Sequence, residues 1–291
     1  MGTCPQDTHE PARRLRNWLA EFDRVFVLTG AGCSTGSGIP DYRDAQGEWK
    51  RLPPVNFRDF VDDPRVHARY WARSFVGWPL ISGAQPNAAH LALASWEGSG
   101  RLSQLLTQNV DGLHERAGSR ATIDLHGRID QVVCLHCAAT YPRAQVQSWL
   151  AQDNPDWAGL AAATAPDGDA DLEGRDFSRF RATRCEACDG MLKPDVVFFG
   201  ESVPRARYEI AQAALLRAQA LLVVGSSLMV YSGFRFARMA HEAGRPIAIL
   251  NHGRTRADDL ASFKLEADCT TILPLALDDI DSPGDCAYGV P

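Results

Sequence analysis

The sequence predicts an α/β fold built around a mostly parallel sheet. Short apolar runs rich in Val, Ile and Leu recur at residues 24–28, 102–106, 221–224 and 246–250. Segments with helical periodicity lie between them, and the alternation is most regular from residue 204 onward. Repeated βα units of this kind form a parallel sheet that helices cover on both faces.

The predicted helices and strands can be assigned in order along the chain. Residues 11–22 place Leu15, Trp18, Leu19 and Phe22 at i, i+3, i+4 and i+7, which predicts an amphipathic helix before the strand 24–28. Residues 45–85 interrupt the alternation with aromatic and basic side chains. It resumes at residue 86 with a helix and the strand 102–106, and a further strand is predicted at 122–125.

The carboxyl-terminal part alternates without interruption. A helix through Leu215 precedes the strand 221–224, and a helix at 232–243, with Gly244 past its end, precedes the strand 246–250. Between the two halves, residues 154–176 are rich in Asp, Gly and Ala and predict a loop.

Composition limits the classes of function. A chain of 291 residues with 45% hydrophobic content can bury one large core or two modest ones. Thirty basic and 36 acidic side chains give a net charge of −6, so the basic footprint of a nucleic-acid-binding protein is lacking. No apolar stretch approaches the roughly 20 residues of a membrane span. The first residues lack a hydrophobic signal core and carry Asp7 and Glu10. We expect a cytoplasmic protein that binds neither nucleic acid nor membrane.

A glycine-rich loop follows the first predicted strand. Residues 29–43 read TGAGCSTGSGIPDYR, and their glycines let the backbone turn tightly and present N–H groups to an anion, as dinucleotide-binding turns do. A purely structural loop is the alternative. The carboxylate, phenol and guanidinium of Asp41, Tyr42 and Arg43 come directly after it, which favours a ligand site.

Two further polar groups follow predicted strands. Gln108, Asn109 and Asp111 come just after the strand 102–106, and His126 follows the strand 122–125. The carboxyl ends of parallel strands form the rim at which ligands bind. A single histidine is more often a packing residue, but an imidazole on this rim can accept a proton at neutral pH.

Four of the eight cysteines form two Cys-x-x-Cys pairs, Cys134 with Cys137 and Cys185 with Cys188. Two matched pairs suit a tetrahedral zinc ion, whereas a redox pair or disulfides are the alternatives. His136 lies inside the first pair, but four thiolates already close the shell, so we expect this histidine to face solvent. A closed shell leaves no position for water, so the zinc is expected to be structural.

Together these motifs resemble the sirtuin family, the NAD-dependent protein-lysine deacylases. The resemblance runs from Arg24 to Cys269 and includes residues 193–201, 225–228 and 249–251. Residues 70–73, 75–79, 165–169 and 230–233 are most similar to the class II branch, and within it to the mitochondrial sirtuins described as lipoamidases and ADP-ribosyltransferases.

The resemblance implies a Rossmann-like large domain and a small domain formed by a zinc ribbon and a helical insertion. We expect residues 11–44, 86–133 and 200–280 in the large domain. The helical insertion 45–85 and the zinc-ribbon module 134–199 would together form the small domain, and 281–291 a tail.

The resemblance also implies what NAD is used for. A dehydrogenase usually carries an acidic residue about 20 positions after its glycines, but the aromatic insertion occupies that region here. The bond between nicotinamide and ribose would be broken instead. The implied cofactor-binding residues are Gly30, Ala31, Gly32, Ser34, Thr35, Ile39, Pro40, Asp41, Tyr42, Arg43, Gln108, Asn109, Val110, Asp111, Gly225, Ser226, Ser227, Asn251, His252, Gly253 and Cys269.

The implied catalytic residues are His126, Asn109 and Asp111. Asn109 and Asp111 would hold the nicotinamide carboxamide while the acyl-lysine oxygen attacks the ribose carbon. His126 would then act as general base on the ribose hydroxyls. The products would be nicotinamide, O-acyl-ADP-ribose and free lysine, and zinc takes no part in these steps.

Substrate contacts are implied at two places. Tyr70 and Arg73 lie at i and i+3 on a predicted helix, and in class II sirtuins such a pair meets the carboxylate of succinyl- or glutaryl-lysine, so acidic acyl groups are expected. The peptide would add as a strand beside Val197, Phe198, Phe199 and Gly200 and beside residues 225–230. We expect a monomer.

Two other classes of function stay open. The same NAD site could serve a protein ADP-ribosyltransferase or a lipoamidase. The second alternative is a non-catalytic module that senses NAD or binds partners through a zinc ribbon. A protein that only binds NAD would not need His126, Asn109 and Asp111.

Overall fold

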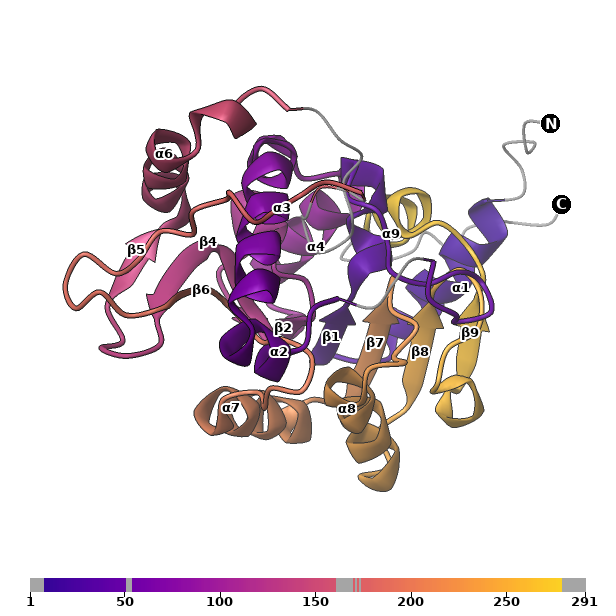
Figure 1. Ribbon diagram of the computed structural model, residues 1–291. Helices are drawn as coiled ribbons and strands as arrows, with labels where there is room; N and C mark the ends of the chain where they lie inside the picture. The colour runs from indigo at the N-terminus through magenta and orange to yellow at the C-terminus, as the bar shows by residue number, and fades with distance from the viewer. Residues whose placement is uncertain (1–7, 51–53, 161–169, 171, 173, 279–291) are drawn as a thin grey trace, which may run out of the picture.

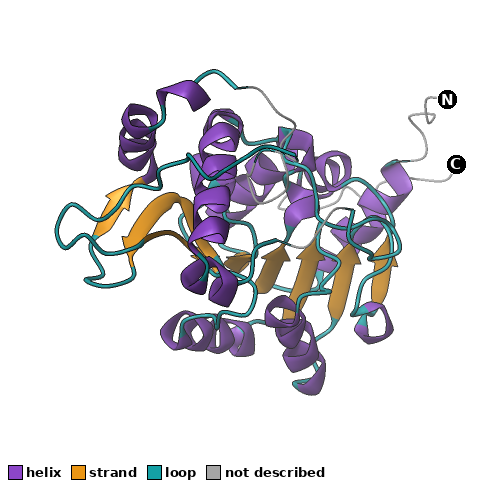
Figure 2. Ribbon diagram, viewed as in Figure 1, coloured by secondary structure: helices purple, strands orange, loops and turns teal. Residues whose placement is uncertain are grey.

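The computed structural model describes residues 8–50, 54–160, 170, 172 and 174–278, and these form a six-stranded and a three-stranded sheet (Figures 1 and 2). The larger sheet is parallel throughout, in the order β3-β2-β1-β7-β8-β9. Its strands are β1 (Val25–Thr29), β2 (Leu102–Thr107), β3 (Thr122–Asp124), β7 (Ala220–Val224), β8 (Ile247–Leu250) and β9 (Phe263–Leu265). The predicted parallel α/β architecture is confirmed.

Helices cover both faces of this sheet, which explains its continuous apolar strands. Figure 1 shows α7 and α8 on one side and α4 and α9 on the other. Leu15, Leu93 and Ile272 pack on one face of the sheet, and Leu215 and Phe236 pack on the other. The helices are α1 (His9–Ala20), α4 (Ala88–Gly98), α5 (Leu113–Arg116), α7 (Arg205–Arg217), α8 (Tyr231–Glu242) and α9 (Cys269–Leu277), with 3₁₀ turns η2 (Ala31–Cys33), η3 (Thr35–Ser37) and η5 (Asp258–Leu260).

The strand order reverses between β1 and β7. From β1 the sheet continues to β2 and β3, and from β7 it continues to β8 and β9. Loops that leave two such strands diverge, so a crevice opens at their carboxyl ends. The glycine-rich loop after β1 and the loop that begins at Gly225 both leave from this point.

The small domain combines two segments that are far apart in the sequence. Its helices are α2 (Phe57–Asp62), α3 (Pro64–Gly83) and α6 (Arg143–Asp153), with the 3₁₀ turn η4 (Pro155–Trp157). Its antiparallel strands are β4 (Gly127–Cys134), β5 (Thr140–Pro142) and β6 (Leu192–Val196). Phe60 and Trp71 of the helical insertion share one core with Val146 and Leu192 of the zinc-ribbon module, so the two segments fold as one unit.

The predicted domain boundary between 133 and 134 needs correction. Strand β4 pairs with β5 and β6, so the small-domain sheet begins at Gly127, directly after His126. Gly127 has φ +83°, and an added Cβ would lie 2.0 Å from the Asp195 carbonyl oxygen. Only glycine permits this close approach of two strands at the point where the chain leaves the large domain.

The predicted loop 154–176 is held to the small domain where the structure describes it. Trp157 stacks on Phe177 and meets the edge of Phe180, so this segment shares the small-domain core despite its polar composition. Residues 161–169 and the predicted tail 281–291 lie outside the described residues. In the described part of the chain, none of the helices has the length and apolar character needed to cross a membrane.

Candidate active site

A cleft of about 530 Å³ lies at the strand reversal and has walls from both domains. Gly30, Asn109 and Ser226 line it from the large domain, and Tyr70 and Phe198 line it from the small domain. The carboxyl ends of β1, β2 and β7 therefore meet the helical insertion across one cavity.

Most of the predicted cofactor-binding residues line this cleft. They are Gly30, Ala31, Gly32, Ser34, Ile39, Asp41, Tyr42, Arg43, Gln108, Asn109, Val110, Asp111, Gly225, Ser226, Ser227, Asn251 and His252. Thr35, Pro40, Gly253 and Cys269 are not among the lining residues. The Thr35 hydroxyl and the Cys269 thiol both donate to the Gly32 carbonyl, so these two side chains brace the glycine-rich loop from outside the cleft.

The two loops at the strand reversal touch through their backbones. An added Cβ on Gly225 would lie 2.3 Å from the Cys33 amide nitrogen, and one on Gly32 would lie 2.9 Å from the Gly225 carbonyl oxygen. The amides of Gly30 and Gly32 donate to the carbonyls of Val224 and Gly225, so they hold the loops together and do not point at a ligand. This glycine-rich floor of the cleft suits a dinucleotide.

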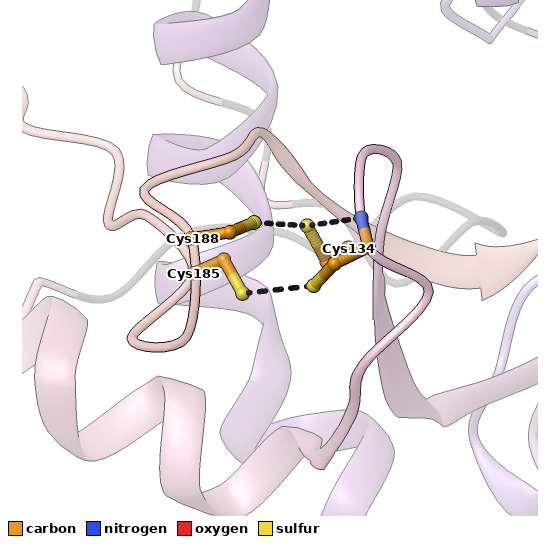
Figure 3. Close-up of side chains that lie close together, drawn as sticks. Cys134, Cys185 and Cys188 are labelled. Atoms are coloured by element: carbon orange, nitrogen blue, oxygen red, sulfur yellow. Dashed lines mark hydrogen bonds between the residues drawn. The ribbon is translucent and has the colours of Figure 1, made fainter.

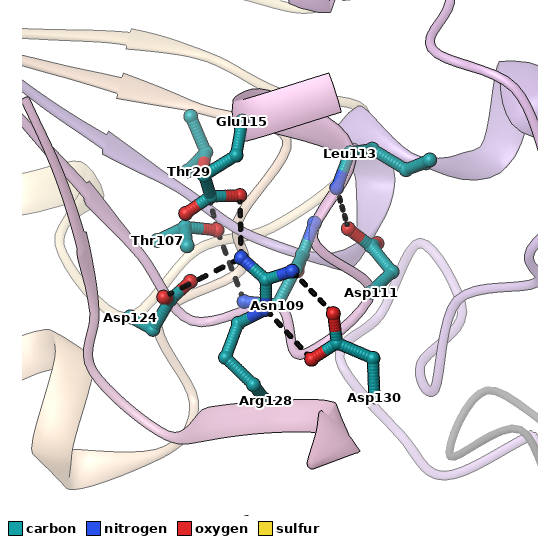
Figure 4. A network of polar contacts seen from close by, with 9 residues as sticks. All are labelled: Thr29, Thr107, Asn109, Asp111, Leu113, Glu115, Asp124, Arg128 and Asp130. Atoms are coloured by element: carbon teal, nitrogen blue, oxygen red, sulfur yellow. Dashed lines mark hydrogen bonds and ion pairs between the residues drawn. The ribbon is translucent and has the colours of Figure 1, made fainter. Parts of the chain in front are cut away.

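Asn109, Ser34 and Asp111 form a hydrogen-bonded chain on the cleft wall. Asn109 Nδ2 donates to Ser34 Oγ at 2.9 Å, and the Ser34 hydroxyl donates to Asp111 Oδ2 at 2.7 Å. Asp111 Oδ1 also accepts from the Leu113 amide, and Figure 4 shows this contact at the start of α5. Burial raises the pKa of Asp111. The chain fixes an amide and a carboxyl group side by side.

A charged cluster ties this wall to strand β4. Arg128 contacts Glu115 at 3.1 Å, Asp130 at 2.7 Å and Asp124 at 3.9 Å (Figure 4). Burial, together with the neighbouring Glu115, raises the pKa of Asp124 to about 7. Arg128 and Asp130 belong to β4, whereas Glu115 belongs to α5 and Asp124 to β3, so the cluster joins the two domains beside the cleft.

His126 also lines the cleft, and both of its ring nitrogens have partners. Nδ1 lies 2.9 Å from the Gln108 carbonyl oxygen, and Nε2 lies 2.8 Å from Ser232 Oγ. A carbonyl only accepts, so Nδ1 carries the proton and Nε2 accepts from the Ser232 hydroxyl. Burial lowers the pKa of His126 to about 4, so the ring is neutral at pH 7 with a lone pair on Nε2.

Several lining residues were absent from the predicted set. Ser232, in the first turn of α8, contacts His126. Trp49 also lines the cleft, and the centroid of its ring lies 5.5 Å from that of Phe199. Ile81 and Ile129 add apolar surface. The segment 230–233 is part of the family resemblance, which is a signal that could have identified Ser232.

The structure separates the two predicted acyl-contact residues. Tyr70 lines the cleft and packs 5.1 Å from the Phe198 ring. Arg73 is not among the lining residues, because its Nε donates to the Ala170 carbonyl at 2.9 Å and its own carbonyl accepts from the Ala170 amide. The expectation that both side chains enter one pocket is therefore met by Tyr70 and not by Arg73.

The predicted peptide-binding segment, Val197, Phe198, Phe199 and Gly200, lines the cleft. The Val197 amide donates to the His126 carbonyl at 2.7 Å. The Phe198 amide donates to Glu201, whose carboxylate also contacts the buried Lys193 at 3.1 Å. These contacts hold the segment in place next to His126.

The four predicted metal ligands come together at the far end of the small domain (Figure 3). The Sγ atoms of Cys134 and Cys188, and those of Cys137 and Cys185, are 3.6 Å apart. Tetrahedral zinc with bonds of about 2.3 Å separates its sulfurs by about 3.8 Å, so the cluster fits a structural zinc ion. His136 is exposed, as predicted.

Comparison with known proteins identifies relatives of this chain. Residues 30–232 match the family model described as Sir2 family. The chain is 60% identical over 259 residues to an NAD-dependent protein deacetylase of Xanthomonas campestris, covering 89% of this chain and 88% of the relative. It is 47% identical over 269 residues to the bovine NAD-dependent protein lipoamidase sirtuin-4, mitochondrial, covering 91% and 85%. A solved structure of Sir2 with a p53 peptide and NAD+ superposes with a TM-score of 0.72 at 28% identity, covering 92% of this chain and 97% of the other.

The parallel α/β domain, the glycine-rich cofactor floor and the four-cysteine module define an NAD-dependent enzyme of the protein deacylase class. The chain belongs to the Sir2 family, the sirtuins.

Proposed function

We propose that this sirtuin transfers acyl groups from protein lysine side chains to the ADP-ribose part of NAD, with His126 as the general base. The observation that carries this assignment is the neutral ring of His126, which lines the same cleft as Asn109 and Asp111 and has its Nε2 lone pair directed at Ser232. When bound, NAD supplies a ribose carbon that becomes electrophilic as nicotinamide leaves.

His126 would take a proton from a ribose hydroxyl that replaces the Ser232 hydroxyl at Nε2. The Gln108 carbonyl holds the Nδ1 proton, so it keeps Nε2 as the accepting atom and stabilises the positive charge after transfer. General base catalysis of this kind contributes roughly 10² to 10⁴ in rate.

Asn109 and Asp111 would bind the nicotinamide carboxamide. Their link through Ser34 leaves neither side chain free to rotate without breaking a hydrogen bond. A fixed amide and carboxyl pair suits a carboxamide, which both donates and accepts.

The protein substrate would add as a short strand beside residues 197–200 and 225–230. Both segments contribute to the cleft. The first is held by the hydrogen bond from the Val197 amide to the His126 carbonyl and by the bridge between Phe199 and Asn56. Strand addition uses backbone hydrogen bonds, so it would give affinity with little sequence preference. The solved Sir2 relative with a p53 peptide supports a peptide substrate.

Two acyl preferences follow from different residues. The apolar and aromatic surface of Tyr70, Phe198, Ile81 and Ile129 favours neutral acyl groups such as acetyl or lipoyl. Acidic acyl groups such as succinyl, glutaryl or methylglutaryl need a cation at the cleft. The candidate Arg73 is not among the residues that line it, and its Nε is bound to the Ala170 carbonyl. Because Arg73 would have to turn toward the cleft to meet an acyl carboxylate, we put neutral groups first.

The test is a panel of acetyl-, lipoyl-, succinyl-, glutaryl- and methylglutaryl-lysine peptides, with kcat/KM measured in the presence of NAD. Neutral groups should lead, and Arg73→Met should affect all substrates alike. If Arg73→Met lowers turnover of acidic substrates roughly 10- to 150-fold and spares acetyl-lysine, acidic groups are the true class. Tyr70→Phe, which removes a single hydroxyl, is the matched control.

ADP-ribosyl transfer is the competing chemistry of the same site. Labelled ADP-ribose appearing on protein in the absence of an acyl substrate, without O-acyl-ADP-ribose from any peptide, would replace the deacylation proposal. Robust release of O-acyl-ADP-ribose from an acyl peptide supports it.

A further inference from the structure

Three arginines gather around one exposed aromatic ring at the rim of the cleft. Tyr231, the first residue of α8, is 42% exposed. The guanidinium carbon of Arg235 lies 5.5 Å from its ring centroid, and those of Arg238 and Arg256 lie 5.6 Å from it. Tyr231 and Arg235 line the cleft, and so does Ser232 between them. This arginine cluster (Arg235, Arg238 and Arg256) therefore begins inside the cleft and continues onto the exposed surface.

Aromatic rings hold two of these guanidinium groups in place. Arg235 lies 4.5 Å from the ring centroid of Tyr208 in α7, and Arg256 lies 4.5 Å from that of Phe234 in α8. Figure 1 shows both helices on the same side of the large sheet. A guanidinium that stacks on a ring is oriented by it and still presents the N–H donors of its edge.

The positive charge of the arginine cluster is only partly compensated. Arg238 contacts Glu242 at 3.4 Å. Neither Arg235 nor Arg256 forms an ion pair with any other residue in the part of the chain that the structure describes. The whole protein has a net charge of −6, so the positive charge at this rim is a local feature. A carboxylate placed there would meet donors and charge that the fold leaves available.

The arginine cluster adjoins one end of the segment 225–230, beside which the protein substrate would add as a strand. That segment runs directly into Tyr231. Arg256 is tied to it twice, because its amide donates to the Ser227 carbonyl at 2.8 Å and its guanidinium donates to the Met229 carbonyl at 3.4 Å. Substrate residues on one flank of the acyl-lysine would therefore pass the cluster, and those on the other flank would not.

We propose that Arg235 and Arg256 select protein substrates that carry acidic residues on one flank of the acyl-lysine. The inference rests on the proposed function, since it concerns the peptide that enters this cleft. Strand addition by itself reads little sequence, whereas clusters of arginine recognise acidic motifs through charge and paired N–H donors. Because Arg235 lines the cleft, the entering peptide is favoured over a nucleic acid or a membrane as the source of the carboxylates.

The first experiment measures peptide binding without catalysis. Acetyl-lysine peptides with two glutamates on one flank are compared with their glutamine analogues, for each flank in turn, and Kd is measured by fluorescence anisotropy without NAD. On one flank, glutamate should lower Kd roughly 2- to 25-fold, the range for two exposed ion pairs. The gain should vanish at 1 M salt, where the Debye length is about 3 Å. No gain, or an equal gain on both flanks, would overturn the proposal.

The second experiment asks whether the two arginines carry the preference. The double variant Arg235→Gln and Arg256→Gln should abolish the difference between the two peptides, whereas Arg235→Lys with Arg256→Lys, which keeps both charges, should retain part of it. Because the preference is a ratio of two Kd values, a general loss of affinity cancels. Arg14→Gln is the matched control, since Arg14 stacks on Phe263 at 4.8 Å and does not line the cleft. An unchanged ratio in the glutamine double variant would overturn the assignment.

Turnover with NAD separates this inference from the proposed function. The glutamate peptide should have a lower KM than its glutamine analogue at a similar kcat, because contacts remote from the reacting atoms bind substrate and transition state alike. Deacylation of both peptides with equal KM would overturn the selectivity and leave deacylation standing, whereas acyl peptides that neither bind nor react would overturn both. If Arg235→Gln instead weakens succinyl-lysine peptides with neutral flanks, Arg235 serves the acyl group and the flank preference is overturned.

Discussion

The Nδ1 atom of His126 lies 2.9 Å from the carbonyl oxygen of Gln108, the first residue after strand β2. This contact sets the tautomer of the ring, because a carbonyl can only accept. The backbone at the carboxyl end of β2 therefore determines which ring nitrogen can act as a base. Nε2 faces Ser232 on the cleft.

His126→Ala should reduce deacylation by roughly 10² to 10⁴, because it removes the proposed base while leaving the cofactor floor in place. NAD affinity, measured by calorimetry, and the melting temperature should change little. His241→Ala, an exposed histidine at the end of α8, is the matched control and should retain wild-type turnover. A His126→Ala enzyme with half of wild-type activity would remove the residue from the mechanism.

The pH dependence follows from the lowered pKa of His126. Burial shifts it from the usual 6.5 to about 4, so the neutral, proton-accepting form persists well below neutrality. On the acid side, kcat/KM should stay level from pH 8 to about 5 and fall only as pH approaches 4. The measurement is a pH profile with a substrate that lacks titratable groups in this range. An inflection near 6.5 would mean that the ring is not desolvated in the working enzyme.

Removing the zinc ligands should destabilise the small domain. The double variant Cys134→Ser and Cys185→Ser takes one thiolate from each pair, and the free energy of metal binding is also folding free energy. Zinc content should fall sharply, and limited proteolysis should cleave the small domain first. Full zinc occupancy in this double variant would contradict a four-thiolate site.

Gly127→Ala should destabilise the enzyme as a whole. The position has φ +83°, and a Cβ would lie 2.0 Å from the Asp195 carbonyl oxygen, so either β4 or β6 has to shift. We expect a loss of at least roughly 2 kcal/mol, or about 4–8 °C in melting temperature. Gly83→Ala is the control, because an added Cβ at the end of α3 meets nothing within 4 Å. A neutral Gly127→Ala would show that the two strands tolerate separation at this point.

Much of this protein could be predicted from local pattern. The parallel strands are continuous apolar runs because both of their faces are covered, so they can be recognised from the sequence. The loop after β1 needs glycine because another backbone passes within van der Waals contact, and two closely spaced cysteine pairs have few uses other than a metal. Each of these features depends on residue types within a few positions of one another.

The remaining features depend on contacts between distant segments. The tautomer of the His126 ring is set by its hydrogen bonds to Gln108 and to Ser232, which is 106 residues away. Arg73 donates to the carbonyl of Ala170, which is 97 residues away. Arg256 meets the rings of α8 only because the loop before η5 packs against that helix. A sequence determines which side chains can ionise, bind metal or accept a proton. Burial and neighbours decide whether they do so, because desolvation and hydrogen bonding act through space, and only the folded chain brings those neighbours together.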